Sequence, residues 1–295
     1  MLLTILATPS QAGDPAGYVY PIEDPFEATV TGTPVELKHR YRHKKPMRLD
    51  SFELDIFPER ELPPLFRPVR SLAFSLAYQE TPAPLLFVIA GTGGSHRAST
   101  ARYLQRVFYQ AGFHVITLSS PSSYEFITAA SESGYPGISD EDARDLYRVM
   151  QMSLELAREH ISITDVYLTG YSLGGAQTAF IMKLDEQEKA FNFKKGLMIN
   201  PPVSLYNSAL LLDSYLRDNI TTGQDAVRFW DQLTQVMGEE YAETQGVVQL
   251  GPDFLYEVYR KRRPDDENLA ILIGLAFAIT AQNMVTVADV LTQSG

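Results

Sequence analysis

Two glycine-rich stretches hold the residues that could do chemistry. The first reads Gly170-Tyr-Ser172-Leu-Gly174-Gly175, a Gly-x-Ser-x-Gly pattern whose serine hydroxyl can act as a nucleophile. It follows an apolar strand-like run and precedes a helical run, so the chain must turn sharply at the serine. A turn this tight strains the serine backbone and leaves room only for hydrogen at the flanking positions, which explains the three elbow glycines. We therefore predict that Ser172 attacks a carbonyl carbon.

The second stretch, FVIAGTGGSH at residues 87–96, can stabilise the negative charge that such an attack creates. The N–H of Leu173 lies at a helix N-terminus and can donate one hydrogen bond to an oxyanion. A second donor should come from the loop after an earlier strand, which is glycine-rich here. The sequence thus predicts an oxyanion hole formed by the N–H of Leu173 and that of Thr92 or Gly93.

These motifs resemble the α/β-hydrolase fold, and in particular its serine hydrolases of the esterase and lipase type. The oxyanion strand of that fold commonly ends in His-Gly-x-Gly-Gly-Ser, and the chain matches it at Gly91, Gly93, Gly94 and Ser95, with Ala90 in place of the histidine. The resemblance covers about residues 70–203. It implies acyl transfer from an ester to water by an enzyme that needs no cofactor and no metal.

A base for the serine is missing from the downstream sequence. The resemblance implies that an acid and then a histidine follow the nucleophile, but all five histidines precede Ser172: His39, His43, His96, His114 and His160. Three explanations stay open: the chain is C-terminally incomplete, His96 serves as the base, or the chain is a non-catalytic relative that binds an apolar ligand or a protein partner. In the first case we expect the isolated chain to be inactive.

The elements that must position the serine follow from hydrophobic periodicity. Strands are expected within 49–57, 70–79, 84–91, 113–119, 164–170 and 195–202, and helices within 95–112, 139–160 and 173–184. The run at 84–91 is apolar on both faces, which is typical of a central strand in a parallel sheet. Alternation of strands and helices predicts an α/β protein, a three-layer α/β/α sandwich of the α/β-hydrolase type.

Beyond residue 203 the pattern becomes helical, at 207–220, 225–243, 253–263 and 268–291. We expect a signal peptide at 1–12, an N-terminal extension at 13–60, the α/β-hydrolase core at 61–203, and a helical cap or insertion at 204–295. The apolar run at 269–281, with Trp230, Tyr256 and Tyr259, suggests an apolar ester as the small-molecule substrate. That run is shorter than the roughly 20 residues that cross a bilayer, so a buried helix and no transmembrane segment are expected.

Composition excludes several other classes of protein. The net charge of -11 argues against nucleic-acid binding, and the absence of cysteine rules out disulfides, thiolate metal sites and a cysteine nucleophile. Neither a P-loop nor a Gly-x-Gly-x-x-Gly nucleotide motif is present. The N-terminal apolar run ends in Ser10-Gln11-Ala12, which is similar to a signal-peptide cleavage site and predicts a periplasmic or secreted protein, with a cytoplasmic location as the alternative.

Overall fold

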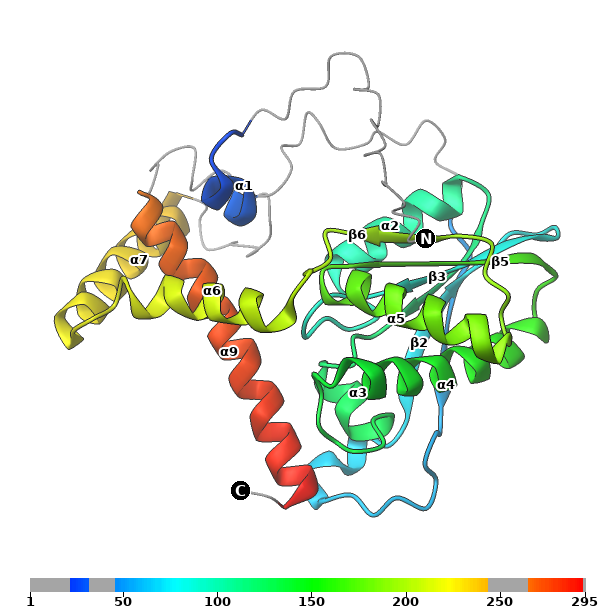
Figure 1. Ribbon diagram of the computed structural model, residues 1–295. Coiled ribbons are helices and arrows are strands. Elements are labelled where there is room, and N and C mark those ends of the chain that lie inside the picture. The colour runs from blue at the N-terminus through cyan, green and yellow to red at the C-terminus, as the bar shows by residue number, and fades with distance from the viewer. Residues whose placement is uncertain (1–21, 32–45, 244–264, 294–295) are drawn as a thin grey trace, which may run out of the picture. The chain divides into compact units, whose positions relative to one another are not determined.

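The computed structural model describes residues 22–31, 46–243 and 265–293, which fall into two compact units (Figure 1). The larger unit contains residues 46–217 and 274–293, and the smaller one contains residues 22–31, 218–243 and 265–273. The signal peptide expected at 1–12 lies outside the described residues. The expected domain boundaries after residues 60 and 203 stay predictions.

A six-stranded sheet forms the larger unit, in the order β1-β2-β4-β3-β5-β6. The strands are β1 (Leu49–Leu54), β2 (Leu72–Ala77), β3 (Ala83–Ile89), β4 (His114–Leu118), β5 (Ile163–Tyr171) and β6 (Gly196–Ile199). Strands β4, β3, β5 and β6 run parallel to their neighbours in that group, whereas β1 and β2 pair antiparallel. All side chains of β4 and nearly all of β3 are buried, which confirms the predicted central parallel strand.

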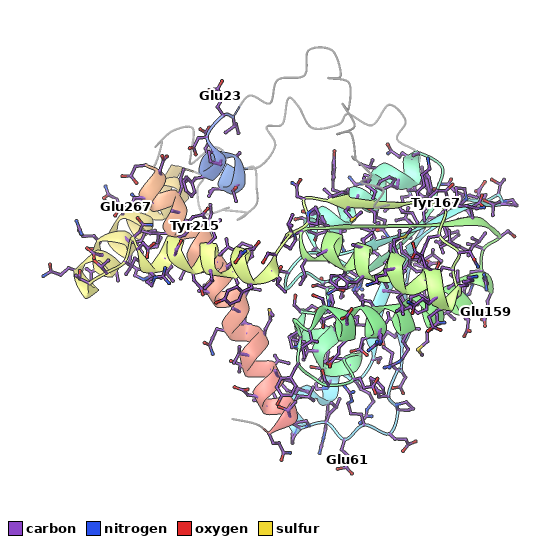
Figure 2. All side chains as sticks on the ribbon, in the orientation of Figure 1. Glu23, Glu61, Glu159, Tyr167, Tyr215 and Glu267 are labelled. Carbon is purple, nitrogen blue, oxygen red and sulfur yellow. The ribbon has the colours of Figure 1, made fainter. Side chains whose placement is uncertain are left out.

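Helices cover both faces of this sheet. Those that contact its strands are α2 (Ser99–Gln110), α3 (Tyr124–Ala129), α4 (Ser139–Arg158) and α5 (Leu173–Glu188). The larger unit also contains η2 (Pro64–Val69), α6 (Leu205–Arg217) and the second part of α9 (Asp266–Thr292). On one face Leu85 and Phe87 of β3 pack in a cluster with α4 and α5; on the other, Leu86 packs with α2. On that second face the Tyr167 ring of β5 meets Phe113 edge-on, 5.5 Å between centroids (Figure 2). The predicted three-layer α/β/α sandwich is confirmed.

The smaller unit is helical in its described part, with α1 (Pro25–Thr31), α7 (Gly223–Glu243) and the first part of α9. The helices expected at 207–220, 225–243 and 268–291 are confirmed as α6, α7 and α9. The helix expected at 253–263 lies among residues that the structure does not describe.

Helix α9 differs from its prediction in two ways. The apolar run at 269–281 is by itself too short for a bilayer, but it is part of a helix of 27 residues. The length and composition of this helix would allow it to span a membrane. It is also mostly exposed, because 28% of its apolar stretch is buried: Leu269–Ile273 are covered, whereas Ile279 is 54% exposed. The apolar pattern continues past residue 281, and the polar residues that follow do not end a helix. Core helices and signal sequences pass the same test, so this is weak evidence for a membrane.

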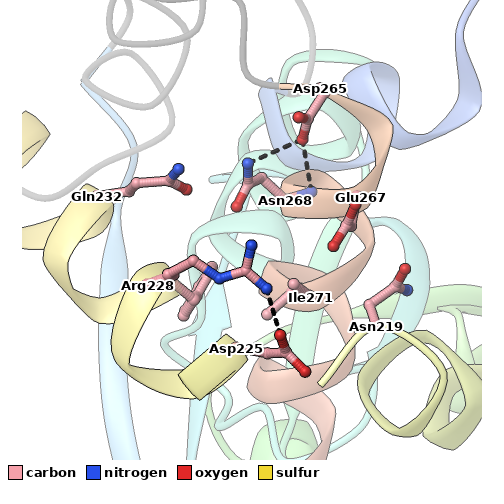
Figure 3. A pocket seen from close by; sticks show the side chains of 9 residues that line it. Asn219, Asp225, Arg228, Gln232, Asp265, Glu267, Asn268 and Ile271 are labelled. Carbon is pink, nitrogen blue, oxygen red and sulfur yellow. Dashed lines mark hydrogen bonds and ion pairs between the residues drawn. The ribbon is translucent and has the colours of Figure 1, made fainter. Parts of the chain in front are cut away.

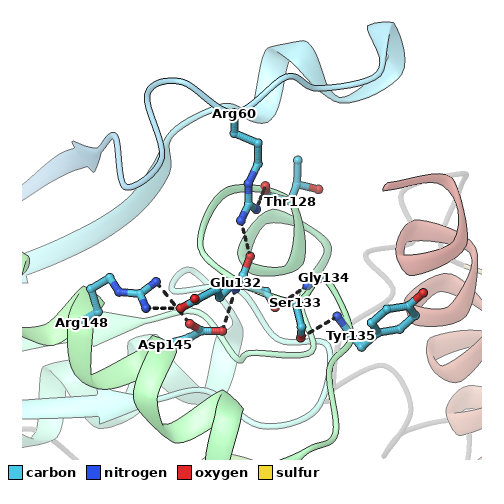
Figure 4. Close-up of polar contacts among 9 residues, drawn as sticks. Arg60, Thr128, Glu132, Ser133, Gly134, Tyr135, Asp145 and Arg148 are labelled. Atoms are coloured by element: carbon cyan, nitrogen blue, oxygen red, sulfur yellow. Dashed lines mark hydrogen bonds and ion pairs between the residues drawn. The ribbon is translucent and has the colours of Figure 1, made fainter. Parts of the chain in front are cut away.

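Charged side chains hold the loop between α3 and α4 (Figure 4). The Asp145 carboxylate accepts the N–H of Glu132 at 2.9 Å and lies 3.4 Å from the Arg148 guanidinium. Arg60, which follows β1, donates to the Thr128 carbonyl at 3.0 Å. These contacts fasten the end of α3 to the first turns of α4.

A second buried carboxyl group, Asp142, lies one turn into α4. Its Oδ2 accepts the N–H of Gly137 at 3.0 Å and the side-chain amide of Gln177 at 3.4 Å. Burial raises the pKa of Asp142 from 3.8 to about 7. The negative charges of Asp145 and Glu141 also raise this pKa, whereas the hydrogen bond from Gly137 lowers it. The native protein therefore favours the protonated form of this side chain.

We predict that Asp142→Asn removes a pH dependence of stability. The folded state keeps the Asp142 proton up to about pH 7, whereas the unfolded chain loses it near pH 3.8, so the native protein loses stability as pH rises through this window, by at most about 1.4 kcal/mol per pH unit. Relative to the wild type, the free energy of unfolding of the variant should therefore increase between pH 4 and 7, as measured by urea denaturation. The exposed neighbour Asp140→Asn is the control, and a pH-independent difference for Asp142→Asn would contradict the prediction.

Candidate active site

Ser172 stands on the sharp turn that the sequence predicted. It joins β5 directly to α5 with φ 54° and ψ −124°, a left-handed conformation that few residues other than glycine adopt. Its N–H donates to the Ile199 carbonyl at 2.9 Å, and its carbonyl accepts the N–H of Gly175 at 2.9 Å. The side chain is partly exposed, and no side chain in the described part of the protein hydrogen-bonds to Oγ. A strained residue with an unengaged hydroxyl is what a nucleophile elbow requires.

The three elbow glycines are required by close backbone contacts. A Cβ at Gly170 would lie 2.2 Å from the Gly174 carbonyl oxygen, and one at Gly174 would lie 2.4 Å from the Ile89 carbonyl oxygen. At Gly175 the nearest atom would be the Ile199 oxygen, at 3.0 Å. Helix α5 thus begins with its backbone pressed against the ends of β3 and β6, which leaves no space for side chains.

We predict that Gly174→Ala destabilises the protein by more than about 3 kcal/mol, because the obstructing atoms are backbone and cannot rotate away. Urea denaturation measures the loss. The matched control is Gly223→Ala at the start of α7, where a Cβ meets nothing within 4 Å and stability should be unchanged or slightly higher. Equal stability of the two variants would contradict this packing argument.

The oxyanion loop runs directly beside the nucleophile. A Cβ at Gly91 would lie 3.2 Å from the Cβ of Ser172 and 2.8 Å from the Tyr171 ring. The N–H of Gly93 is already engaged, since it donates to Ser122 Oγ at 2.9 Å. For the N–H of Thr92 the structure gives no partner within its described ranges. Of the two alternative donors predicted from this loop, Thr92 is therefore the one whose amide is left for a ligand.

A buried serine cluster after β4, at residues 119–123, holds this loop and was not anticipated from the sequence. Besides accepting from Gly93, the Ser122 hydroxyl lies 2.9 Å from that of Ser120, whose N–H donates to the Gly94 carbonyl at 2.9 Å. Both serines are buried. The available signal was four serines directly after a buried parallel strand, since such strand ends line the crevice of open α/β sheets.

We predict that Ser122→Ala slows the reaction of Ser172 with a fluorophosphonate about 10-fold, because the Gly93 amide loses its acceptor and the loop is no longer held. Intact-protein mass spectrometry follows the labelling rate. Ser122→Thr keeps the hydroxyl and should restore most of the rate, and Ser153→Ala, a buried serine within α4, is the control. An unchanged rate in Ser122→Ala would show that the cluster does not orient the loop.

The described histidines are occupied elsewhere. His96, the candidate improvised base, is buried; its Nε2 accepts from Arg97 at 3.1 Å, and burial, followed by the charges of Arg97 and Arg102, lowers its pKa to about 4. Both features make it a poor base. His114 is fully buried, with Nδ1 accepting the N–H of Gln79 at 3.1 Å, and burial lowers its pKa.

The remaining histidines do not supply the base either. His160 is exposed at the end of α4 and packs against Phe52, with 5.1 Å between ring centroids. His39 and His43 lie outside the described residues, as do Tyr256 and Tyr259. Within the described ranges, the structure therefore brings a nucleophile and an oxyanion loop together but no base.

The helical unit has its own polar pocket, of about 170 Å³, shown in Figure 3. Three carboxylates that follow Ser172 in the sequence line it, Asp225, Asp265 and Glu267, and the two aspartates lie at the starts of helices. Asp225 accepts from the N–H of Thr222 at 2.8 Å at the start of α7, and Asp265 accepts from the N–H of Asn268 at 3.0 Å at the start of α9. Hydrogen bonds from Thr222, first of all, lower the pKa of Asp225. These contacts explain the two aspartates as helix caps.

Fold and site together define a class of protein: an α/β sandwich with a serine on a strand-to-helix elbow beside a glycine-rich loop. No family model and no curated protein matches the chain. Solved structures that resemble it include esterases, peptidases and other serine hydrolases.

Three of these structures illustrate the range. Est1E from Butyrivibrio proteoclasticus is 14% identical, with 48% of this chain and 51% of that one covered and a TM-score of 0.35. The hyperthermophilic esterase from Pyrobaculum calidifontis is 14% identical, with 64% and 54% covered and a TM-score of 0.39. The acylaminoacyl peptidase from Pyrococcus horikoshii is 16% identical, with 57% of this chain and 25% of that one covered and a TM-score of 0.39. The chain spans about half the length of the two esterases. The fold assignment rests on the strand order of the sheet and on the Ser172 elbow.

Proposed function

We propose that the protein is a serine hydrolase that transfers the acyl group of a small-molecule ester to water, with Ser172 as the nucleophile. The observation that carries this proposal is the conformation of Ser172: a positive φ on a strand-to-helix turn, with the hydroxyl partly exposed and the oxyanion loop directly beside it. A non-glycine residue pays for such a conformation with about 1–3 kcal/mol, and sites of this kind cluster where chemistry occurs.

In this mechanism Ser172 Oγ forms a bond to the ester carbonyl carbon, and the hydroxyl proton passes to a base. The carbonyl oxygen becomes an oxyanion that accepts hydrogen bonds from the N–H groups of Leu173 and Thr92. The tetrahedral intermediate then expels the alcohol, which takes up the proton, and water attacks the acyl-serine to release the acid and restore the hydroxyl. One oxyanion donor is worth about 10²- to 10³-fold in rate.

The base is the part that the described residues do not provide. Oxyanion donors and substrate binding alone accelerate acyl transfer by about 10³-fold over water. We therefore expect the 295-residue chain by itself to turn over p-nitrophenyl esters only slowly. Robust turnover by this chain would mean that a base does reach Ser172.

A non-catalytic binding protein is the second candidate function. It is favoured by the state of the described histidines, because His96 and His114 are both committed to structural hydrogen bonds and have lowered pKa values. In this alternative the space beside the oxyanion loop binds a ligand, and Ser172 does not react with it. Reactivity of Ser172 separates the two functions.

Three expectations from the sequence also stay proposals. The Ser10-Gln11-Ala12 pattern supports export to the periplasm or secretion. The helical pattern of residues 204–295 supports a helical cap or insertion. An apolar substrate was inferred from residues of this region such as Trp230, which is 52% exposed on α7.

We predict that a fluorophosphonate probe labels the wild-type chain at one residue, Ser172, and that Ser172→Ala is not labelled. The elbow exposes this hydroxyl and the neighbouring amides stabilise the developing charge on the phosphoryl oxygen. Peptide mapping by mass spectrometry identifies the site. Ser99→Ala, an exposed serine at the start of α2 just beyond the oxyanion loop, is the matched control and should label normally. Absence of wild-type labelling would favour the binding protein.

A further inference from the structure

A pocket of about 430 Å³ begins where the oxyanion loop ends. All of its lining residues belong to the larger compact unit: Thr92, Gly93, Gly94, Ser95, Ser122, Tyr124, Glu125, Thr280, Asn283 and Met284. Thr92 carries the amide left for an oxyanion, and the preceding Gly91 is packed against Ser172. A substrate with its carbonyl at Ser172 would therefore extend one substituent into this pocket.

The wall formed by α9 is held in place by contacts at both ends of the pocket. Thr280 approaches the oxyanion loop so closely that a Cβ at Gly93 would lie 2.7 Å from its Cγ2. About two turns further along α9, Val287 packs against Phe66 of η2 and Ile127 of α3. The pocket is thus built from four fixed segments: the oxyanion loop, the serine cluster, α3 and α9.

The chemistry of the lining is polar and acidic. Its side chains include four hydroxyl-bearing serines and threonines, one amide and one carboxylate, while Met284 and the ring of Tyr124 are the large apolar groups among the residues that line it. Glu125 is the only charged residue of the lining, and it is half-buried. Within the described ranges no arginine, lysine or histidine pairs with it.

We propose that this pocket is a subsite for a cationic substituent of the substrate, an ammonium group that pairs with Glu125 and donates to the surrounding hydroxyls. The substrates are then esters that carry an amine on the side facing the oxyanion loop, rather than the purely apolar esters that the helical region suggested. A carboxylate without a protein cation in a concave, hydroxyl-lined site gains a charge-assisted hydrogen bond from such a ligand. As a substrate assignment the inference rests on the proposed function.

Calorimetric titration of the full chain with benzylamine and with benzyl alcohol tests the subsite directly. We expect benzylamine to bind about 10-fold more tightly than the neutral alcohol, and Glu125→Gln to lower benzylamine affinity about 5- to 10-fold without changing the affinity for benzyl alcohol. Glu188→Gln, an exposed carboxylate at the end of α5, controls for non-specific attraction to an acidic protein. Equal binding of the two probes, or an unchanged preference in Glu125→Gln, overturns the proposal.

A second variant and a second readout separate this proposal from the hydrolase itself. Asn283→Trp, at an exposed lining position of α9, should weaken both probes by filling the pocket. Benzylamine should slow fluorophosphonate labelling of Ser172 in the wild type and not in Glu125→Gln. If the amine binds through Glu125 but Ser172 never labels, the cation site stands and the hydrolase fails. If Ser172 labels but the amine shows no preference, the hydrolase stands and the cation site fails.

Discussion

The contact on which the site depends is the approach of the α5 backbone to the carboxyl end of β3. The hydrogen of Gly174 points at the Ile89 carbonyl oxygen, 2.4 Å from where a Cβ would lie. Because α5 begins so close to the sheet, Ser172 has to turn within one residue, and its φ of 54° follows from that geometry. The adjacent central strands β3 and β4, whose side chains are nearly all buried, supply packing energy that keeps a strained residue in place.

The oxyanion loop is organised by the same edge of the sheet. Ser120 and Ser122 follow β4 and bind the backbone of Gly93 and Gly94 by hydrogen bonds of 2.9 Å. These hydroxyls are buried, so their hydrogen bonds are not in competition with water. Amides that are positioned before a reaction begins stabilise a transition state without reorganising, which is the main contribution of such loops to catalysis. The serine cluster is therefore part of the site although it touches no substrate carbonyl.

The charged groups at the site are mostly negative. The protein carries a net charge of -11, and the residues that line the pocket beside Thr92 contribute one carboxylate and no cation. Two of the described histidines, His96 and His114, are buried and engaged in structural hydrogen bonds, and burial lowers the pKa of each. The described residues thus favour binding of a cation and stabilisation of an oxyanion, while proton transfer from Ser172 needs a group that they do not contain.

The sequence by itself determined the local elements of this protein. The sequence predicted strands β3, β4 and β5, the start of α5 directly after Ser172, and the need for glycine around this serine. Apolar runs and the glycines of a tight turn are encoded within a few consecutive residues. The oxyanion loop was predictable for the same reason. Tertiary structure alone decided the strand order, the engagement of the Gly93 amide by Ser122, and the hydrogen bond from the Gln79 N–H to His114. It also decided that α9 is largely exposed and that its residue Thr280 closes the pocket next to Gly93. These features join residues far apart in the chain, and a local pattern carries no information about which distant groups will meet.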